Sequence, residues 1–351
     1  MAPSYTARKP KPVKKAPGKA AQAKAPTQNA PTSSFPLDLQ QLLLNIFKNS
    51  FPESLSSDVK ATIQEVKGHL YNRDFATAFG RKEYLEAYAL RWSPSRALCY
   101  LQILHDLKDE LELSKRSIEE SEQAEWDVVC LGGGAGAEII ALGGLMKLLE
   151  PVTKERPAEI KTSVIDIADW ESVVASLREG VVTKPPLSKY ASAAVQAANQ
   201  ALTDGSSFGV TFHQHDVLNL DIEVLRSVVK KADLVTLMFT LNELYTTSLS
   251  LTQKFLLNLT TCLQPGARLL VVDSPGSYSS VSLNGAEKKY PMQWLLDHTL
   301  LSTGAKGVVE EPKWEKIKDE ESAWFRLADG LKYPIELENM RYQLHLYQRL
   351  G

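Results

Sequence analysis

The chain has 351 residues and a mass of 38.9 kDa, with 40 Lys and Arg residues against 42 Asp and Glu residues and a formal net charge of −2. The charges are segregated: seven basic residues and no acidic residue lie in residues 1–34, so a tail of about +7 precedes a body of about −9. An apolar fraction of 44% suits a packed core and excludes a wholly disordered or fibrous protein. The three cysteines are far apart, which excludes a disulfide framework and a thiolate zinc site.

Residues 1–34 combine six prolines with Lys, Ala, Ser and Thr, which offer too little apolar surface to offset the entropy of ordering. We therefore expect a disordered basic tail. It has no apolar segment typical of a secretory signal, and its prolines disfavour the helix of a mitochondrial transit peptide. Residues 9–15 (KPKPVKK) are typical of a nuclear import signal and of a phosphate-binding arm, while a solubilising tail without a specific role is the alternative.

Residues 35–122 contain apolar positions at helical spacing, such as Leu39, Leu42 and Ile46, and predict a helical N-terminal region. Ser93 followed by Pro94 predicts an N-cap and the first position of a new helix. We expect this region to form a lid on the substrate side of the domain that follows.

Residues 123–351 alternate short apolar runs with helical stretches, and the predicted strands are residues 127–131, 160–166, 210–215, 233–239 and 268–273. This alternation predicts an α/β fold with a doubly wound parallel sheet. Residues 180–208 are longer than a usual connection and include an Ala-rich stretch, residues 192–202, that predicts a helix. We interpret them as an insertion between the second and third strands.

A glycine loop follows the first predicted strand and leads into a helix that begins near Glu138. Glycines allow close approach of a ligand, and the N–H groups at a helix start are free donors. Gly132, Gly134 and Ala137 satisfy the G-x-G-x-x-A pattern of dinucleotide enzymes, whereas Gly132, Gly134 and Gly136 satisfy the G-x-G-x-G pattern of S-adenosylmethionine enzymes. The motif alone leaves both cofactors open.

Acidic residues end the next two strands. Asp166 lies 30 residues beyond Gly136, later than the dinucleotide fingerprint requires, and could accept both ribose hydroxyls. Asp216 could accept from an adenine amino group, and an N-cap or loop role is the alternative for either acid. All these strand ends share the carboxyl edge of the sheet, where α/β folds bind ligands. The predicted cofactor-binding residues are Leu131, Gly132, Gly133, Gly134, Ala135, Gly136, Asp166, Ile167, Asp216, Val217 and Phe239.

The order of motifs over residues 131–273 resembles the class I S-adenosylmethionine-dependent methyltransferases. The resemblance implies S-adenosyl-L-methionine as cofactor and a Rossmann-like, seven-stranded, mostly parallel sheet with an antiparallel C-terminal hairpin. Residues 307–317 and 340–349 supply the two strands of that hairpin, and the second alternates as a half-buried strand should.

Three further segments, residues 84–96 (YLEAYALRWSPSR), 322–326 (SAWFR) and 333–342 (YPIELENMRY), resemble a fungal methyltransferase family that includes a yeast large-subunit ribosomal RNA uridine-N3 methyltransferase. This resemblance implies an enzyme of rRNA processing and ribosome biogenesis that methylates N3 of a uridine. It implies ribosomal RNA or a pre-ribosomal particle as partner, a nuclear or nucleolar location with the cytoplasm as alternative, no membrane, no metal and a monomer.

Methyl transfer from a sulfonium is an in-line displacement, so the protein must align the acceptor and remove the proton that uracil N3 carries. Asn242 could hydrogen-bond a base edge, and Glu243 is the nearest candidate base, with a helix N-cap as its alternative role. Arg326, close to Trp324, could stabilise negative charge on a uracil carbonyl, with a surface ion pair as the alternative.

Arg91 and Arg96 flank the predicted helix start and could contact the methionine carboxylate or an RNA phosphate, or could pair with acids. Trp92 and Trp324 complete the predicted substrate contacts; Trp92 is expected to pack against its neighbours, with a platform for an unstacked base as its alternative role.

Three other functions remain open from the residues alone. They are a methyltransferase acting on proteins or small molecules, a non-catalytic ribosome-assembly factor that keeps the fold, and a nicotinamide oxidoreductase. The intact glycines and the two strand-end acids argue against a decayed cofactor site.

Overall fold

The computed structural model of the protein describes residues 35–56, 58–113, 125–149, 159–276, 278–283, 286–301 and 311–351. For residues 195, 198, 278–283 and 286–289 it describes the backbone alone. The predicted tail, residues 1–34, lies outside the described residues. The chain from Ser33 to Gly351 forms one compact unit.

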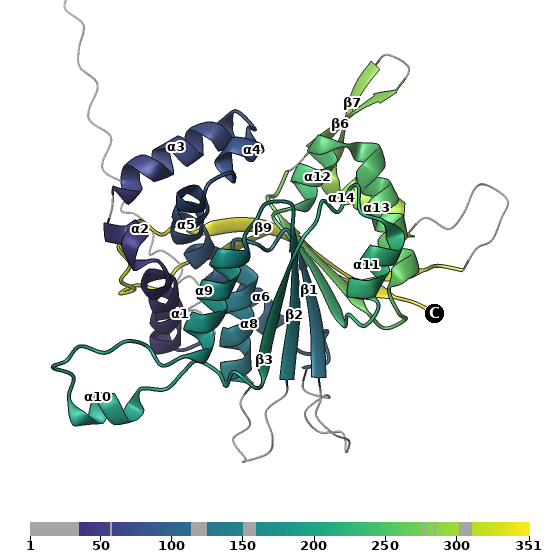
Figure 1. Ribbon diagram of the computed structural model, residues 1–351. Coiled ribbons are helices and arrows are strands. Elements are labelled where there is room, and N and C mark those ends of the chain that lie inside the picture. Colours follow the sequence, from purple (N-terminus) through teal and green to yellow (C-terminus); the bar gives the residue numbers. More distant parts are fainter. Residues whose placement is uncertain are drawn as a thin grey trace, which may run out of the picture. The chain divides into compact units, whose positions relative to one another are not determined.

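A seven-stranded sheet with the order β3-β2-β1-β4-β5-β9-β8 is the centre of the fold (Figure 1). The first five strands are parallel, and β9 runs antiparallel to both of its neighbours, β5 and β8. The strands are β1 (Glu125–Leu131), β2 (Glu159–Asp166), β3 (Phe208–Gln214), β4 (Leu234–Met238), β5 (Arg268–Asp273), β8 (Trp314–Phe325) and β9 (Met340–Arg349). This arrangement confirms the predicted fold, including the antiparallel C-terminal strands.

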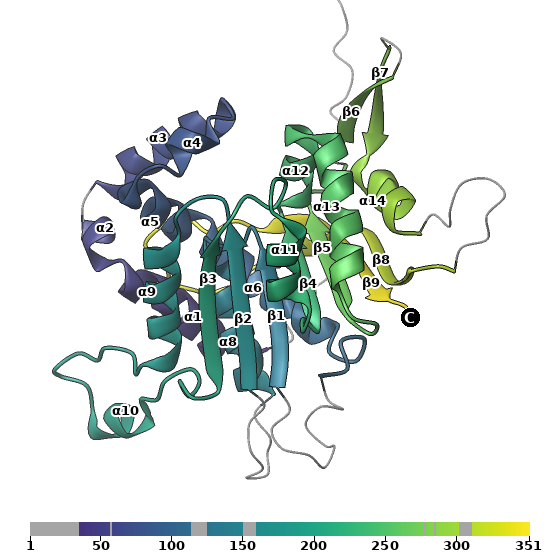
Figure 2. The same cartoon turned by 45° about the vertical axis from the view of Figure 1, so that its right-hand side comes forward.

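Helices cover both faces of the sheet, which is why every residue of β4 and β5 is buried (Figure 2). One core cluster joins one face of the sheet to α1 (Leu37–Ser50), α6 (Ser93–Asp106), α8 (Ala137–Leu148) and α9 (Glu171–Val182). A second cluster joins the other face to α11 (Ile222–Val229), α12 (Leu241–Thr247), α13 (Leu249–Cys262) and α14 (Met292–Leu301).

The predicted N-terminal helices share the first of these cores. In α8, a Cβ atom on Gly144 would lie 2.9 Å from Leu101 of α6 and 3.0 Å from Leu43 of α1, so glycine allows three helices to meet. The other helices of this region are α2 (Pro52–Ser56), α3 (Val59–Tyr71), α4 (Phe75–Ala78) and α5 (Lys82–Arg91).

Two predicted strand features need correction. The first strand of the C-terminal hairpin is not residues 307–317, of which residues 307–310 lie outside the described part of the chain; β8 begins at Trp314. Trp314 fixes this start because its buried indole N–H donates to Thr260 Oγ1 at 2.9 Å. A small separate hairpin, β6 (Tyr278–Leu283) with β7 (Ala286–Pro291), was not predicted.

Two helix boundaries also differ from the prediction. In the insertion, α10 (Ala193–Ala198) ends before Leu202, because Leu202 turns into the core, where it is 1% exposed and its N–H donates to Val181 O at 3.1 Å. Ser93 is not the N-cap of α6, which is Trp92. Its hydroxyl instead donates to the carbonyl of Ala135 in the glycine loop at 2.7 Å.

Candidate active site at the carboxyl edge of the sheet

The glycine loop between β1 and α8 depends on two left-handed residues. Gly132 has φ 77° and Gly136 has φ 80°, conformations that residues with a Cβ atom rarely adopt. A Cβ atom on Gly132 would also lie 2.4 Å from Thr240 Oγ1, and one on Gly136 would lie 2.1 Å from Leu177 Cδ1. The protein's own side chains, and not a ligand, therefore use the space that these glycines leave free.

Asp166 at the end of β2 shapes the same loop. Its carboxylate accepts from Gly134 N at 3.1 Å and from Ala168 N at 3.2 Å. Burial raises the pKa of Asp166, and these two amide donors oppose the shift. Each carboxylate oxygen keeps a second lone pair that can accept a hydroxyl. The neighbouring Ile167 is 63% exposed, an apolar surface of the kind that a purine ring would cover.

Asp216 follows β3 and holds its own loop together. It accepts from Leu218 N at 3.0 Å and from Asn219 Nδ2 at 2.6 Å. These are the contacts expected of a loop acid, the alternative role given above. The predicted contacts of Asp216 and Val217 with adenine stay predictions.

Arg96 on α6 carries a charge that no ion pair among the described residues neutralises. Its Nη1 donates to Tyr88 Oη at 2.8 Å, and its guanidinium lies 5.2 Å from the Phe239 ring centroid. Burial acts to lower the pKa of Arg96, but Tyr88, Tyr100 and Glu138 outweigh it and keep the group charged. Among the described residues no ion pair involves Arg96. Glu138 and Asp273 act on the guanidinium electrostatically without forming an ion pair with it, and a buried cation that no carboxylate contacts directly suits an anionic ligand.

A cavity of about 170 Å³ opens beside this guanidinium. Phe239 lines it from the end of β4 and has φ 59°, a strained conformation for a side chain with a Cβ atom. The lining includes four predicted site residues, Arg91, Trp92, Arg96 and Phe239, together with residues just before and at the start of β9, Glu338, Asn339, Met340 and Arg341. The structure thus brings together three residues predicted as substrate contacts and one predicted for the cofactor.

Arg91 differs from Arg96 because it has an acidic partner. It is 6% exposed and forms an ion pair with Glu338, so pairing with an acid, one of the roles considered for it, is realised. Trp92 packs on Tyr88 with ring centroids 4.7 Å apart. The contacts predicted between Arg91 or Trp92 and a substrate stay predictions.

Of the three predicted catalytic residues, two lie next to each other on α12 and the third lies beyond β8. Asn242 is in the first turn of α12, and Glu243 forms an ion pair with Arg73 at 3.4 Å. Glu243 is not an N-cap, because Thr240 holds that position. Arg326 lies just beyond β8 with its guanidinium 5.4 Å from the exposed Trp324 ring. Among the described residues, no ion pair joins Arg326 to the acids 319–321.

Asp273, which sequence reasoning missed, ends β5 at the same edge. It is 3% exposed and accepts from Ser274 N at 2.7 Å and from Asn242 N at 3.0 Å. Burial raises its pKa to about 6. An acid at the carboxyl end of a parallel strand was the signal used for Asp166, and the same signal would have found Asp273.

Glu138 is a second residue that sequence reasoning missed. It is 4% exposed, accepts from Thr236 Oγ1 at 3.2 Å and lies under Gly133. Burial raises its pKa from 4.5 to about 7. An acidic residue within an apolar stretch after a glycine loop is the sequence signal that could have found it.

Replacing Glu138 with glutamine should stabilise the protein in alkaline solution. Because the folded-state pKa is raised, the carboxyl group costs nothing below its ordinary pKa of 4.5; its cost grows as the pH rises from 4.5 to about 7 and is constant above that. We expect a gain of up to about 3 kcal/mol at pH 8 that vanishes below about pH 4.5. Urea unfolding of both proteins across this pH range measures it; a gain independent of pH would contradict the assignment.

The strand order, the antiparallel β9 and the glycine loop followed by Asp166 define a class I S-adenosylmethionine-dependent methyltransferase. Residues 47–348 match the family described as "putative SAM-dependent methyltransferase". The chain belongs to this family, which decides against the nicotinamide oxidoreductase considered from the glycine motif.

A Saccharomyces cerevisiae protein, "25S rRNA (uridine(2843)-N(3))-methyltransferase", is 32% identical over 328 residues, covering 88% of this chain and 85% of its own. Solved structures give weaker overlays. A SAM-dependent methyltransferase of Methanosarcina mazei has a TM-score of 0.37 at 10% identity, over 68% of this chain and 97% of its own. The Bradyrhizobium japonicum N-methyltransferase NodS in complex with S-adenosylhomocysteine has a TM-score of 0.34 at 13% identity, over 76% of this chain and 97% of its own.

Neither a metal centre nor a membrane-spanning helix is found among the described residues. Within the described residues, no cluster of three or more His, Cys, Asp or Glu side chains could hold a metal ion. No helix in the same part of the chain has the length and apolar character needed to cross a membrane.

Proposed function

We propose that the protein methylates N3 of a uridine in large-subunit ribosomal RNA during ribosome biogenesis, in the nucleus or nucleolus. The observation that carries the proposal is the 32% identity, over 88% of the chain, to the yeast enzyme whose name states that reaction. The cavity between the start of α6, Phe239 and the start of β9 supports it, because cationic and aromatic side chains line the cavity together with Glu338, and such side chains suit recognition of an unstacked base.

The residues present fit the cofactor at both of its ends. Asp166 offers lone pairs to ribose hydroxyls, and the exposed Ile167 offers an apolar face to adenine. Arg96 offers an unpaired guanidinium to the methionine carboxylate. S-adenosylmethionine, when bound, supplies a methyl group on a sulfonium that is already electrophilic. The protein therefore has to align the acceptor and take up one proton.

The acceptor side of the reaction falls to α12 and the C-terminal strands. Asn242 would hydrogen-bond the edge of the uracil, while its own N–H is held by Asp273. Glu243 would remove the N3 proton, and its half-exposed ion pair with Arg73 leaves the carboxylate within reach of solvent. Arg326 and Trp324, exposed together beyond the cavity, would contact the RNA beside the target.

Nucleoside mapping of ribosomal RNA tests the proposal. Cells that lack the protein should lose one 3-methyluridine, which returns on expression of the wild-type chain and not of an Asp166→Ala variant. Unchanged 3-methyluridine would overturn the assignment. If ribosome assembly is lost and both the wild-type chain and the Asp166→Ala variant restore it, the protein is a non-catalytic assembly factor. Methylation of a protein or metabolite would instead identify a methyltransferase of proteins or small molecules.

The basic tail should contribute to RNA affinity because the remaining chain is acidic. If all seven cations contact single-stranded phosphates, deleting residues 1–34 should make the slope of log K against log salt about 5 units shallower. Affinity for S-adenosylhomocysteine should not change. Fluorescence anisotropy with labelled RNA over a salt series measures the slope, and equal slopes for both chains would contradict a phosphate-binding tail.

A further inference from the structure

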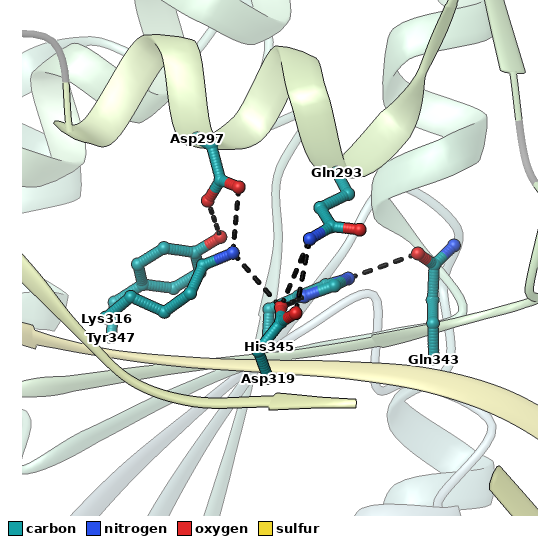
Figure 3. Close-up of polar contacts among 7 residues, drawn as sticks. All are labelled: Gln293, Asp297, Lys316, Asp319, Gln343, His345 and Tyr347. Carbon is teal, nitrogen blue, oxygen red and sulfur yellow. Dashed lines mark hydrogen bonds and ion pairs between the residues drawn. The ribbon is translucent and has the colours of Figure 1, made fainter. Parts of the chain in front are cut away.

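A row of polar side chains lies between β9, β8 and α14 (Figure 3); its β9 members are buried, and those from β8 and α14 are partly exposed. Alternate residues of β9 point to the same face of the sheet. On the other face, Leu344 and Leu346 belong to an apolar core. On this face polar groups from three elements meet: Gln343, His345 and Tyr347 of β9, Lys316 and Asp319 of β8, and Gln293 and Asp297 of α14.

His345 is at the centre of the row and is fully buried. Its Nδ1 lies 2.6 Å from Asp319 Oδ1, and its Nε2 lies 3.1 Å from Gln343 Oε1. Gln343 Nε2 donates to the carbonyl of Ser274 at 2.7 Å, and a carbonyl only accepts. This fixes the orientation of the Gln343 amide, so its oxygen must accept from His345. The contact with Asp319 needs a second proton.

His345 Nε2 therefore carries the proton that it donates to Gln343, and a second proton is shared between His345 Nδ1 and Asp319 Oδ1. Burial lowers the pKa of His345, and the hydrogen bond to Asp319 opposes that shift. Lys316 from β8 and Asp297 from α14 are the other charged groups that face the ring, and they act in opposite directions. The paired arrangement keeps Gln343 in one orientation.

The hydrogen bonds continue from Gln343 to the candidate active site. Gln343 is opposite Asp273 in the pairing of β9 with β5. Ser274, whose carbonyl Gln343 holds, donates its own N–H to Asp273 Oδ1, and Asp273 Oδ2 accepts from Asn242 N. An unbroken series therefore runs from Asp319 through His345, Gln343, Ser274 and Asp273 to Asn242. We call this series the β9 relay.

We propose that His345 and Gln343 are positioning residues for methyl transfer, which set the place of Asn242 through Ser274 and Asp273. The inference rests on the proposed function in taking Asn242 as a substrate contact. Apolar side chains of similar size could fill this face at no loss of stability. The hydrogen bonds of these polar residues instead end at Asn242, in the first turn of α12, which favours a role in positioning that residue. Displacements of about 1 Å in an active site can lower the rate 100-fold.

The variant Gln343→Glu separates the two ends of the β9 relay. A carboxylate still accepts from His345 but cannot donate to Ser274. We expect kcat on an rRNA fragment to fall about 10-fold while the KM for S-adenosylmethionine stays unchanged. Amide hydrogen exchange of residues 239–244 should become faster. Gln343→Met removes the contacts with both His345 and Ser274 and should have the same effects. Because methionine is uncharged, this variant also controls for repulsion between the new carboxylate and the Ser274 carbonyl.

Tyr347→Phe is the matched control. Tyr347 lies on the same face of β9 and donates to Asp297 Oδ1 at 2.7 Å, but it is not part of the β9 relay. This variant should lower the melting temperature without changing kcat or the exchange of residues 239–244. If all three variants lower kcat in proportion to stability, the relay is structural only and the inference is overturned.

Hydrogen exchange distinguishes a failure of the β9 relay from a failure of the proposed function. If even the wild-type chain fails to methylate the rRNA fragment, the proposed function fails, but exchange still reports on the relay. Faster exchange of residues 239–244 in Gln343→Glu and not in Tyr347→Phe supports the relay. Equal exchange in both variants overturns it.

Discussion

Replacing Arg96 with methionine should weaken the binding of S-adenosylhomocysteine about 100-fold, which corresponds to about 2.8 kcal/mol. The guanidinium has no acidic partner among the described residues and lies beside Phe239 and a cavity. A charge-assisted contact with a carboxylate contributes about 1.5–3 kcal/mol, and methionine keeps the length of the side chain without the charge. Calorimetry with the wild-type and variant proteins measures the loss.

A second ligand makes this test specific. 5′-Methylthioadenosine has the adenosine and the sulfur but no carboxylate, so its affinity should be the same for both proteins. The free energy of unfolding without ligand should change little, because the variant loses the contact with Tyr88 and also loses an unpaired cation. Unchanged affinity for S-adenosylhomocysteine together with weaker RNA binding would instead assign Arg96 to an RNA phosphate.

Replacing Asp166 with asparagine should weaken the binding of both S-adenosylhomocysteine and 5′-methylthioadenosine by about 30-fold, or roughly 2 kcal/mol. The carboxylate is the predicted acceptor for the ribose, which both ligands carry, and it also holds Gly134 N and Ala168 N. An amide has one acceptor oxygen where the carboxylate has two. Equal losses for the two ligands would distinguish this position from Arg96.

Asp216→Asn is the matched control for Asp166. Its carboxylate accepts from Leu218 N and Asn219 Nδ2 within its own loop, so we expect a loss of affinity below about 5-fold, or 1 kcal/mol. A loss equal to that of Asp166→Asn would show that Asp216 contacts adenine directly. Wild-type affinity in Asp166→Asn would contradict the assignment of the ribose site to the end of β2.

The strands of the parallel half were predictable because each contains a short apolar run, which is fully buried in β4 and β5 and partly exposed in β2 and the edge strand β3. The predicted bounds of β5, residues 268–273, agree with the structure, and those of β1, β2, β3 and β4 differ by at most two residues at each end. The strand β8 was harder to predict. Between Trp314 and Phe325 its residues are mostly exposed and charged, so no apolar pattern marks its extent.

The site was only partly predictable because the partners of its charged side chains lie far away in the sequence. Arg91 and Arg96 look equivalent in the sequence, yet Glu338 neutralises Arg91 from a segment 247 residues away. The β9 relay joins Asp319, Gln343 and Asn242 through three strands and helix α12, and no local spacing reveals it. The left-handed backbone of Phe239 is also invisible, because the residue is not a glycine.

The close meeting of helices at Gly144 has a consequence for how such a protein can diversify. Leu43 and Leu101 contact α8 where a side chain on Gly144 would stand, so the N-terminal helices are built into the core of the catalytic domain. They cannot be exchanged for another substrate-recognition module without rebuilding that core. The mostly exposed residues 183–194, which lead from α9 into α10, are by contrast a place where length and sequence can change at little cost.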